Sequence, residues 1–222
     1  MDLEVSHIKK SFKSKLVLQD ITFSARKGTC IGILGGNGCG KTTLLSILAG
    51  ILKGDGGSFF WQGKNVFEEK GMFSQVVGYV PQGTPLFEEL TAKDNLLLWY
   101  NRKALREELD DGVLALLHIN DFLHMPVSRM SVGMKKRLSI GCAVAGKQPV
   151  LLLDEPTAAL DLECKQQIWD YLTDYQHRGG IILLVTHDVN EIEHCDRCYL
   201  MKDGRLEKYE YDGDVRRLVR RL

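Results

Sequence analysis

The amino-acid sequence predicts an α/β fold built on a mostly parallel β-sheet, and three observations carry this prediction. Residues 150–153 and 181–185 are short, fully apolar runs, as expected of parallel strands that are buried on both faces. A segment with helical spacing, roughly residues 163–178, lies between them and ends at a pair of glycines. A third apolar run, residues 29–34, ends in a glycine cluster, and a helical pattern follows from Lys41. Strands that alternate with helices in this way predict an α/β sheet.

Length and composition place the chain among ordinary globular proteins. Its 222 residues are enough for one large domain, and 44% apolar with 26% charged residues is a usual balance. The 29 Lys and Arg residues cancel the 29 Asp and Glu residues, so the formal net charge is zero. This balance weighs against a protein that binds nucleic acid through a broad basic field, and we expect no nucleic-acid partner.

The cysteines and the apolar runs bear on the cellular compartment. Six cysteines are too few for a disulfide scaffold of this length, so we expect free thiols in a reducing cytosol. Cys195 and Cys198 form an isolated C-x-x-C, which leaves a zinc site as a minor alternative. The N-terminus lacks the pattern of a secretory signal, and every apolar run is far shorter than the ~20 residues that span a bilayer. We therefore expect a chain that does not cross a membrane by itself.

The first 80 residues are expected to supply mostly strands. Apolar and polar residues alternate in short runs over residues 3–24, which predicts an antiparallel β-ribbon. The apolar run at residues 29–34 predicts the first strand of the parallel sheet. Residues 77–80 are a further short strand candidate, stopped by Pro81.

The period changes to a helical one between about Leu90 and Gly146. Thr91 with Asp94 three residues later has the form of a helix-starting box, and Ser131 is placed to cap a helix that runs to about residue 145. We therefore expect one domain over residues 1–222, divided into two parts. These are a catalytic core with an N-terminal antiparallel β subdomain, residues 1–82 and 147–222, and an inserted helical subdomain, residues 83–146. The last residues, 215–222, carry four arginines among apolar residues and predict a short amphipathic helix or, alternatively, a solvated face.

A glycine-rich loop predicts a phosphate-binding site. Residues 35–42 read Gly-Gly-Asn-Gly-Cys-Gly-Lys-Thr and match G-x-x-x-x-G-K-[ST] between a predicted strand and a predicted helix. Glycines allow backbone N–H groups to converge on phosphate oxygens, and the helix N-terminus adds its positive dipole end. Lys41 would bring a full charge to the β and γ phosphates, and the hydroxyl of Thr42 is placed to ligate Mg²⁺.

Two carboxylates follow the apolar run at residues 150–153. In proteins with this glycine loop, an aspartate at the end of such a strand, here Asp154, holds the Mg²⁺ shell. Glu155 would then point toward the γ phosphate and orient the attacking water or accept its proton. The alternative is that these residues only lead into a helix, since Pro156 and Thr157 suit a helix start.

With these motifs in place, the sequence resembles the nucleotide-binding domain of ATP-binding cassette (ABC) transporters over nearly its whole length. Five further stretches, in the family's order and spacing, carry the resemblance. They are Phe12 at the position of an adenine-stacking aromatic, Gln82 in Tyr79-Val80-Pro81-Gln82, the signature-like Met130-Ser131-Val132-Gly133-Met134, Ala158-Ala159-Leu160-Asp161, and Thr186-His187-Asp188. Each has a plainer alternative: Phe12 as a core residue of the first ribbon, Gln82 as a loop residue, Asp161 as a helix N-cap and His187 as an ordinary strand-end histidine.

The resemblance implies the fold of the ABC ATPases, a P-loop NTPase core, and a site for ATP with Mg²⁺. The implied nucleotide-binding residues are Phe12, Gly35, Gly36, Asn37, Gly38, Cys39, Gly40, Lys41, Thr42, Thr43, Ser131 and Gly133. The implied catalytic residues are Glu155, His187, Gln82 and Lys41, and the implied Mg²⁺ ligands are Thr42, Gln82 and Asp154. Within this set, His187 would contact the γ phosphate, and Gln82 would sense Mg²⁺ and relay its state to the partner.

The signature-like stretch departs from the family's L-S-G-G-Q, because Val132 replaces a glycine and Met134 replaces the glutamine. Ser131 and Gly133 remain, and a serine at a helix N-terminus can donate to a γ-phosphate oxygen. This form of the signature is similar to that of bacterial export ATPases for drugs, peptides or lipids. It also leaves open a pair of unlike subunits.

The resemblance implies an ATPase that drives transport through a separate membrane-spanning permease subunit. In the family, the signature of one subunit completes the site of another, so a homodimer or a heterodimer with a second ABC ATPase is expected. The expected location is the cytoplasm, peripheral on the inner face of the cell membrane. The alternatives are a different P-loop enzyme such as a small-molecule kinase, a non-transport ABC ATPase, and a nucleotide-gated regulatory subunit with little hydrolysis.

Overall fold

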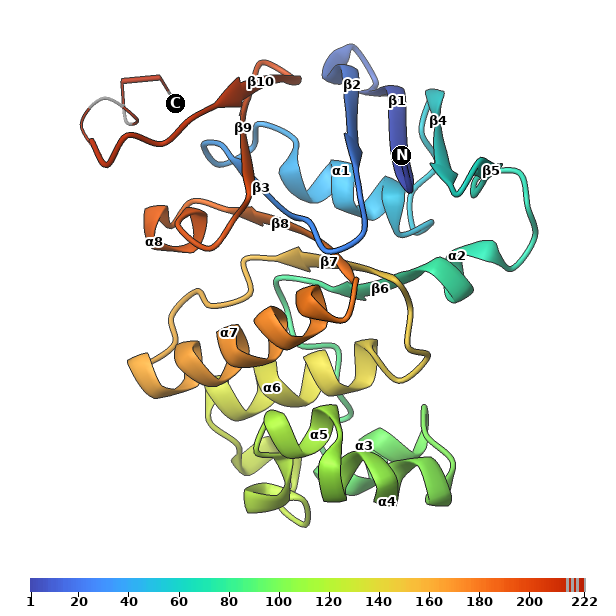
Figure 1. The fold of residues 1–222 in the computed structure, drawn as a ribbon, viewed down its shortest axis with the longest axis vertical. Helices are drawn as coiled ribbons and strands as arrows, with labels where there is room; N and C mark the ends of the chain where they lie inside the picture. Colours follow the sequence, from blue (N-terminus) through green and yellow to red (C-terminus); the bar gives the residue numbers. More distant parts are fainter. Residues whose placement is uncertain (215, 217, 219, 222) are drawn as a thin grey trace.

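The structure is a computed structural model that describes residues 1–214, 216, 218, 220 and 221. Its strands form two sheets (Figure 1). The four-stranded antiparallel sheet has the order β2-β1-β4-β5 and consists of β1 (Leu3–Phe12), β2 (Lys15–Ala25), β4 (Gly56–Trp61) and β5 (Lys64–Asn65). The predicted N-terminal ribbon, β1 with β2, is therefore confirmed, whereas β4 and β5 were not predicted.

The second sheet has six strands in the order β10-β9-β3-β8-β7-β6. They are β3 (Cys30–Leu34), β6 (Val77–Val80), β7 (Val150–Asp154), β8 (Ile181–Thr186), β9 (Arg197–Lys202) and β10 (Arg205–Tyr209). All neighbours pair in parallel except β10 with β9. The predicted apolar runs form its central strands, which are buried on both faces, and the edge pair of β9 and β10 was not predicted.

The register of the parallel strands brings their carboxyl ends to one edge. The last residue of β3, Leu34, pairs with Thr186, which ends β8. Asp154, which ends β7, pairs with the preceding residue of β8, and Val80, which ends β6, pairs with Leu153 of β7. Residues that follow these four strands therefore lie together at one edge, which is where open α/β sheets hold their ligands.

Helices cover both faces of this sheet. α1 (Lys41–Leu48) packs between the two sheets, because its apolar residues share one core with β1, β3 and β8. α6 (Val132–Ala143) and α7 (Leu162–His177) cover the opposite face and share a second core with it. Two short helices complete the core, α2 (Met72–Val76) and α8 (Val189–Ile192).

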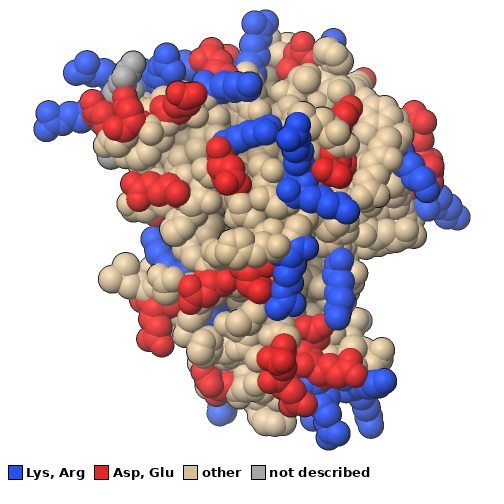
Figure 2. Space-filling view, viewed as in Figure 1, with Lys and Arg blue, Asp and Glu red and all other residues tan. Residues whose placement is uncertain are grey.

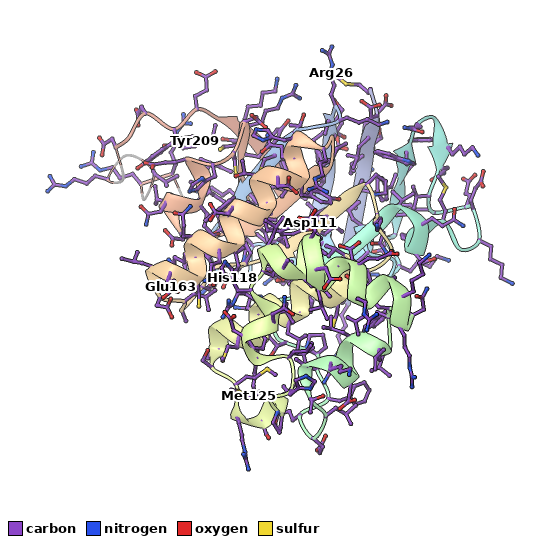
Figure 3. The ribbon with its side chains drawn as sticks, turned by 60° about the horizontal axis from the view of Figure 1, so that its bottom comes forward. Arg26, Asp111, His118, Met125, Glu163 and Tyr209 are labelled. Atoms are coloured by element: carbon purple, nitrogen blue, oxygen red, sulfur yellow. The ribbon has the colours of Figure 1, made fainter. Side chains whose placement is uncertain are left out.

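The segment before α6 is helical, as predicted. It contains α3 (Ala92–Leu97), α4 (Arg102–Asp111), α5 (Val113–Leu116) and two 3₁₀ turns at Ile119–Phe122 and Val127–Arg129. Thr91 and Asp94 form the capping box of α3 that the sequence predicted. These short helices lie at the end of the molecule away from the antiparallel sheet (Figure 1), and they come forward in Figure 3, where Asp111, His118 and Met125 mark them.

α6 is buried along most of its length and packs closely at two glycines. A Cβ atom on Gly141 would lie 2.7 Å from Leu114 Cδ2 of α5, and one on Gly133 would lie 2.5 Å from Cys164 Sγ of α7. Side chains at both positions would clash, so the glycines set how near α6 lies to α5 and α7.

The helix predicted at residues 215–222 includes positions 215, 217, 219 and 222, which lie outside the described residues. Over the described part of the chain, no helix has both the length and the apolar character that a bilayer span requires. Acidic and basic side chains are interspersed on the face shown in Figure 2.

Candidate functional site

The loop between β3 and α1 has the geometry that its glycines allow. Gly40 caps α1 with a φ of 114°, and a Cβ there would lie 2.9 Å from Leu18 Cδ2, so both backbone and space favour glycine. Lys41 is buried, and its Nζ donates to the carbonyl oxygens of Gly35 (2.6 Å) and Gly36 (3.1 Å). The ammonium group is therefore held beneath the loop and points at its backbone.

The end of β7 places a carboxylate beside this loop. Asp154 is buried, its Oδ2 has no hydrogen-bond partner within the described part of the chain, and its side chain interacts with that of Thr42. Burial raises the pKa of Asp154, while the bond to Thr42 acts in the opposite direction. A buried carboxylate oxygen that lacks a partner fits a cation, and carboxylate with hydroxyl oxygen is a donor set that Mg²⁺ accepts.

Glu155 brings three of the predicted catalytic residues together. Its backbone adopts φ 49°, and its N–H donates to the carbonyl of Val185 at 2.9 Å. Its Oε2 accepts from Gln82 Nε2 at 2.9 Å, and its Oε1 lies 2.7 Å from His187 Nδ1. The carboxylate is buried, and contacts on two sides fix its orientation. A general base needs such a fixed orientation toward the water that it activates.

A depression of about 590 Å³, within the usual size of small-molecule sites, is lined by Glu155 and Gln82, whereas His187 lies outside its lining. It is lined by Phe12, Lys15, Val17, Asn37, Gly38, Gly40, Lys41, Thr42, Thr43, Gln82 and Glu155. Phe12 is 46% exposed, so the alternative that it is a core residue is wrong. Its ring lies at the mouth of the depression, with Lys10 Nζ 5.4 Å from the ring centroid. Gly35, Gly36 and Cys39 complete the loop without lining the depression.

The signature-like residues do not line this depression. Ser131 is exposed and caps α6, where its Oγ accepts from Met134 N at 3.2 Å. Gly133 is buried against Cys164 of α7, so its missing side chain serves packing within the chain. Asp161 likewise caps α7 by accepting from Cys164 N at 2.8 Å. These residues form a second surface, separate from the loop at Lys41.

Two buried residues near the site were missed by the sequence analysis. Lys136 of α6 donates from Nζ to the carbonyl oxygens of Pro81 (3.0 Å) and Gln82 (3.3 Å). Burial lowers the pKa of Lys136, and neighbouring carboxylates act in the opposite direction. Glu191 of α8 accepts from both the backbone N–H and the hydroxyl of Thr157, which lies two residues beyond Glu155. A helical pattern alone gives no signal for either contact.

Replacing Lys136 with methionine should lower kcat for ATP by roughly tenfold and leave KM unchanged. A tenfold loss corresponds to about 1.4 kcal/mol, the free energy of one hydrogen bond. The loop that carries Gln82 would lose its anchor, while the loop at Lys41 would keep its contacts. Steady-state kinetics would separate the two parameters. The matched control is Lys135→Met, because the Nζ of Lys135 bonds with Glu88 (2.9 Å) at the surface. Equal kcat values for the two variants would exclude a positioning role for Lys136.

Comparisons with known proteins agree with this geometry. Residues 18–158 match the family described as ABC transporter. The "Nod factor export ATP-binding protein I" of Sinorhizobium fredii is 33% identical over 91% of this chain and 61% of its own length. The "Linearmycin resistance ATP-binding protein LnrL" of Bacillus subtilis is 30% identical over 92% of this chain and 67% of its own length.

A solved structure of an "ATP binding subunit of ABC transporter" superposes with a TM-score of 0.85 and 26% identity, over 99% of this chain and 93% of that one. The chain thus spans 61% and 67% of the two sequence relatives and nearly all of the solved subunit. The predicted fold class, an α/β ABC ATPase fold with an antiparallel and a mostly parallel sheet, is confirmed. By the match over residues 18–158 and by these relatives, the chain belongs to the ABC transporter family.

Proposed function

We propose that the protein binds ATP with Mg²⁺ and hydrolyses it as the energy-supplying subunit of an exporter. The observation that carries the proposal is the convergence of Lys41, Asp154 and Glu155 at one edge of the sheet, where Lys41 and Glu155 line a depression of about 590 Å³. Membership in the ABC transporter family supports the same conclusion.

The phosphate chain of ATP would lie along the loop at residues 35–42. Lys41 would exchange its bonds to two loop carbonyls for bonds to phosphate oxygens, which carry the opposite charge to its ammonium group. Thr42, Asp154 and Gln82 would hold Mg²⁺, which would neutralise charge that develops on the β and γ phosphates. The exposed ring of Phe12 at the mouth of the depression would stack on adenine.

Glu155 would orient the attacking water and take its proton, because its carboxylate faces the depression. Gln82 and His187 each contact one of its oxygens and so fix its direction. With Nδ1 on Glu155, the imidazole of His187 would offer Nε2 to the γ phosphate.

A second copy of the chain, or a related ATPase, would complete the site. Ser131 is exposed yet lies outside the depression at Lys41, so it is available to another molecule. Two apolar residues at the starts of α6 and α7 are also exposed, Val132 (63%), which follows Ser131, and Leu162 (86%). Exposed apolar residues next to a polar anchor are typical of an interface.

The helical segment would meet a membrane-spanning permease. It exposes the large apolar side chains of Phe87 (59%), Leu98 (56%) and Trp99 (67%). We therefore place the protein in the cytoplasm, at the inner face of the cell membrane. The name of the relative from Sinorhizobium fredii, a Nod factor export ATP-binding protein, supports export over import.

Replacing Ser131 with arginine tests the shared site. The variant should bind ATP normally as a monomer but lose dimer-dependent hydrolysis by about 10- to 100-fold, because a bond to a charged phosphate is worth about 1.5–3 kcal/mol. Phosphate release measured against protein concentration reports the dimer-dependent rate. Ser128→Arg, in the exposed turn before α6, introduces the same side chain as a control. If the Ser131 variant hydrolyses ATP at the normal rate, the shared-site proposal fails.

Mixing two inactive chains sharpens this test for a homodimer. Ser131→Ala keeps its own Lys41 and Glu155, while Glu155→Gln keeps its own Ser131. A mixed pair would therefore contain one complete site, and mixing should restore turnover. No gain on mixing would exclude two copies of this chain as the partners.

A further inference from the structure

Three thiols converge where β9 begins beside β3. Cys30 opens β3, Cys195 precedes β9, and Cys198 lies within β9. The Sγ atoms of Cys30 and Cys195 lie 3.7 Å apart, and the Sγ atoms of Cys195 and Cys198 both lie within 4 Å of the position that a Cβ on Gly32 would occupy. The fold thus adds a third thiol to the isolated C-x-x-C of the sequence, and Cys195 is the central one.

Gly32 supplies the space for this thiol cluster of Cys30, Cys195 and Cys198. It pairs with Cys198 across β3 and β9, and a Cβ on it would lie 2.8 Å from Cys195 Sγ and 3.8 Å from Cys198 Sγ. The Sγ atoms of Cys195 and Cys198 therefore both lie next to Gly32 of β3.

An open depression of about 690 Å³ gives access to two of the three thiols. Cys195 and Cys198 are half-buried and line it together with Tyr209, which Figure 3 labels, whereas Cys30 is fully buried. A dissolved reagent can therefore reach Cys195 and Cys198 directly.

The hydrogen bonds divide the roles of the two accessible thiols. Cys195 Sγ accepts a hydrogen bond from Cys30 Sγ (3.7 Å) and donates to the carbonyl oxygen of Glu191 (3.4 Å), whereas Cys198 Sγ makes a longer contact, 3.9 Å, with the carbonyl oxygen of Ile192. Interactions among the thiols and burial raise the pKa of Cys195. Cys198 is therefore the less constrained thiol and the better nucleophile of the pair. Among the residues that the structure describes, no three His, Cys, Asp or Glu side chains are arranged to hold a metal ion.

We propose that Cys195 and Cys198 form a reversible disulfide by exchange with a small disulfide of the oxidised-glutathione class. The Cys198 thiolate attacks one sulfur of the reagent, breaks its S–S bond, releases one small thiol and becomes a mixed disulfide. Cys195 gives up its proton, attacks Cys198 Sγ and displaces the second small thiol. The two cysteines lose two electrons and two protons, and the reagent gains them as two thiols.

The disulfide would act on α8. Cys195 Sγ donates to the carbonyl oxygen of Glu191 at 3.4 Å, and Cys198 Sγ donates to that of Ile192 at 3.9 Å. Oxidation removes both S–H donors at the end of α8. The same helix holds Thr157 through the Glu191 carboxylate, two residues beyond the proposed general base. Oxidation should therefore lower turnover without changing the phosphate loop.

Peptide mapping of the full chain tests the covalent step. Reduced protein is incubated with oxidised glutathione, its free thiols are counted, and it is digested with trypsin under non-reducing conditions. Arg197 lies between Cys195 and Cys198, so trypsin separates the two cysteines unless a disulfide joins their peptides. We expect two of the six thiols to disappear, the two peptides to be joined and dithiothreitol to reverse both changes. Unchanged thiols, or a disulfide between other cysteines, would overturn the proposal.

Single serine variants assign the order of attack. Cys195→Ser should stop at the mixed disulfide and retain one glutathione on Cys198. Cys198→Ser should leave Cys195 unmodified, and Cys30→Ser should still form the disulfide. The matched control is Cys142→Ser, a cysteine of α6 outside the cluster, which should behave as the wild type. Glutathione retained on Cys195 in place of Cys198 would overturn the assigned order.

The effect on turnover rests on the proposed ATPase function and is measured separately. The oxidised wild type should have a lower kcat for ATP, restored by dithiothreitol, with KM unchanged. Cys195→Ser is treated with oxidised glutathione and then with dithiothreitol, which restores all its thiols. Its kcat after such a cycle should equal its kcat before the cycle. Equal kcat in the oxidised and reduced wild type would exclude the coupling through α8. A chain that forms the disulfide but never hydrolyses ATP would instead overturn the proposed function.

Discussion

Replacing Glu155 with glutamine should leave ATP binding intact and lower turnover by about 100- to 10,000-fold, the range for the loss of a general base. Glutamine has the same size, and its carbonyl can still accept the bond that Gln82 Nε2 makes at 2.9 Å. It cannot take a proton from water, so bound ATP should persist and the ATP-bound dimer should accumulate. Phosphate release measures the first effect, and size-exclusion chromatography with ATP measures the second.

The matched control is Glu163→Gln, which makes the same change on an exposed carboxylate in the first turn of α7 (Figure 3). Its turnover should equal that of the wild type. Rapid hydrolysis by Glu155→Gln would refute the assignment of the base.

Replacing Lys41 with alanine should weaken ATP binding by about 10- to 100-fold. The variant loses hydrogen bonds from a charged donor, each worth about 1.5–3 kcal/mol, at a buried position that water fills poorly. It also removes the bonds to the carbonyls of Gly35 (2.6 Å) and Gly36 (3.1 Å), so the empty loop loses internal support. A titration with ATP at fixed Mg²⁺ measures the affinity.

Lys64→Ala provides the control, since Lys64 is an exposed lysine of β5 away from the depression. Its affinity for ATP should not change. Thermal unfolding of both variants would separate lost binding from lost structure. If Lys41→Ala binds ATP as tightly as the wild type while remaining folded, the loop is not the phosphate site.

The central strands were predictable because they are buried on both faces. Residues 150–153 and 181–185 are apolar without interruption, and the structure places them as β7 and β8 in the middle of the sheet. The strands next to the sheet edges give a weaker signal. In β9 the apolar residues 198–201 are enclosed between an arginine and a lysine, and β4 opens with two glycines and a serine, so neither has apolar residues along its whole length or a clean alternation.

The site was predictable where residues follow consecutive parallel strands. Asp154, Gln82 and His187 each lie directly after such a strand or within two residues of its end, and the register brings them to one edge. Lys136 could not be found in this way, because its contact with the loop at Gln82 depends on how α6 packs. Cys30 lies 165 residues from Cys195 in the chain, and only the pairing of β3 with β9 brings the two thiols together.

The two glycine contacts of α6 determine what kind of motion the molecule permits. Gly141 fits against Leu114 on one side, and Gly133 fits against Cys164 on the other, so an added carbon at either point would force the neighbouring side chain to shift. If α6 rotated away from its two neighbours about a hinge, it would lose both contacts. Small sliding movements along the axis of α6 are compatible with this packing. We therefore expect shear, and not hinge bending, when a force acts on the helical segment that contains α3, α4 and α5.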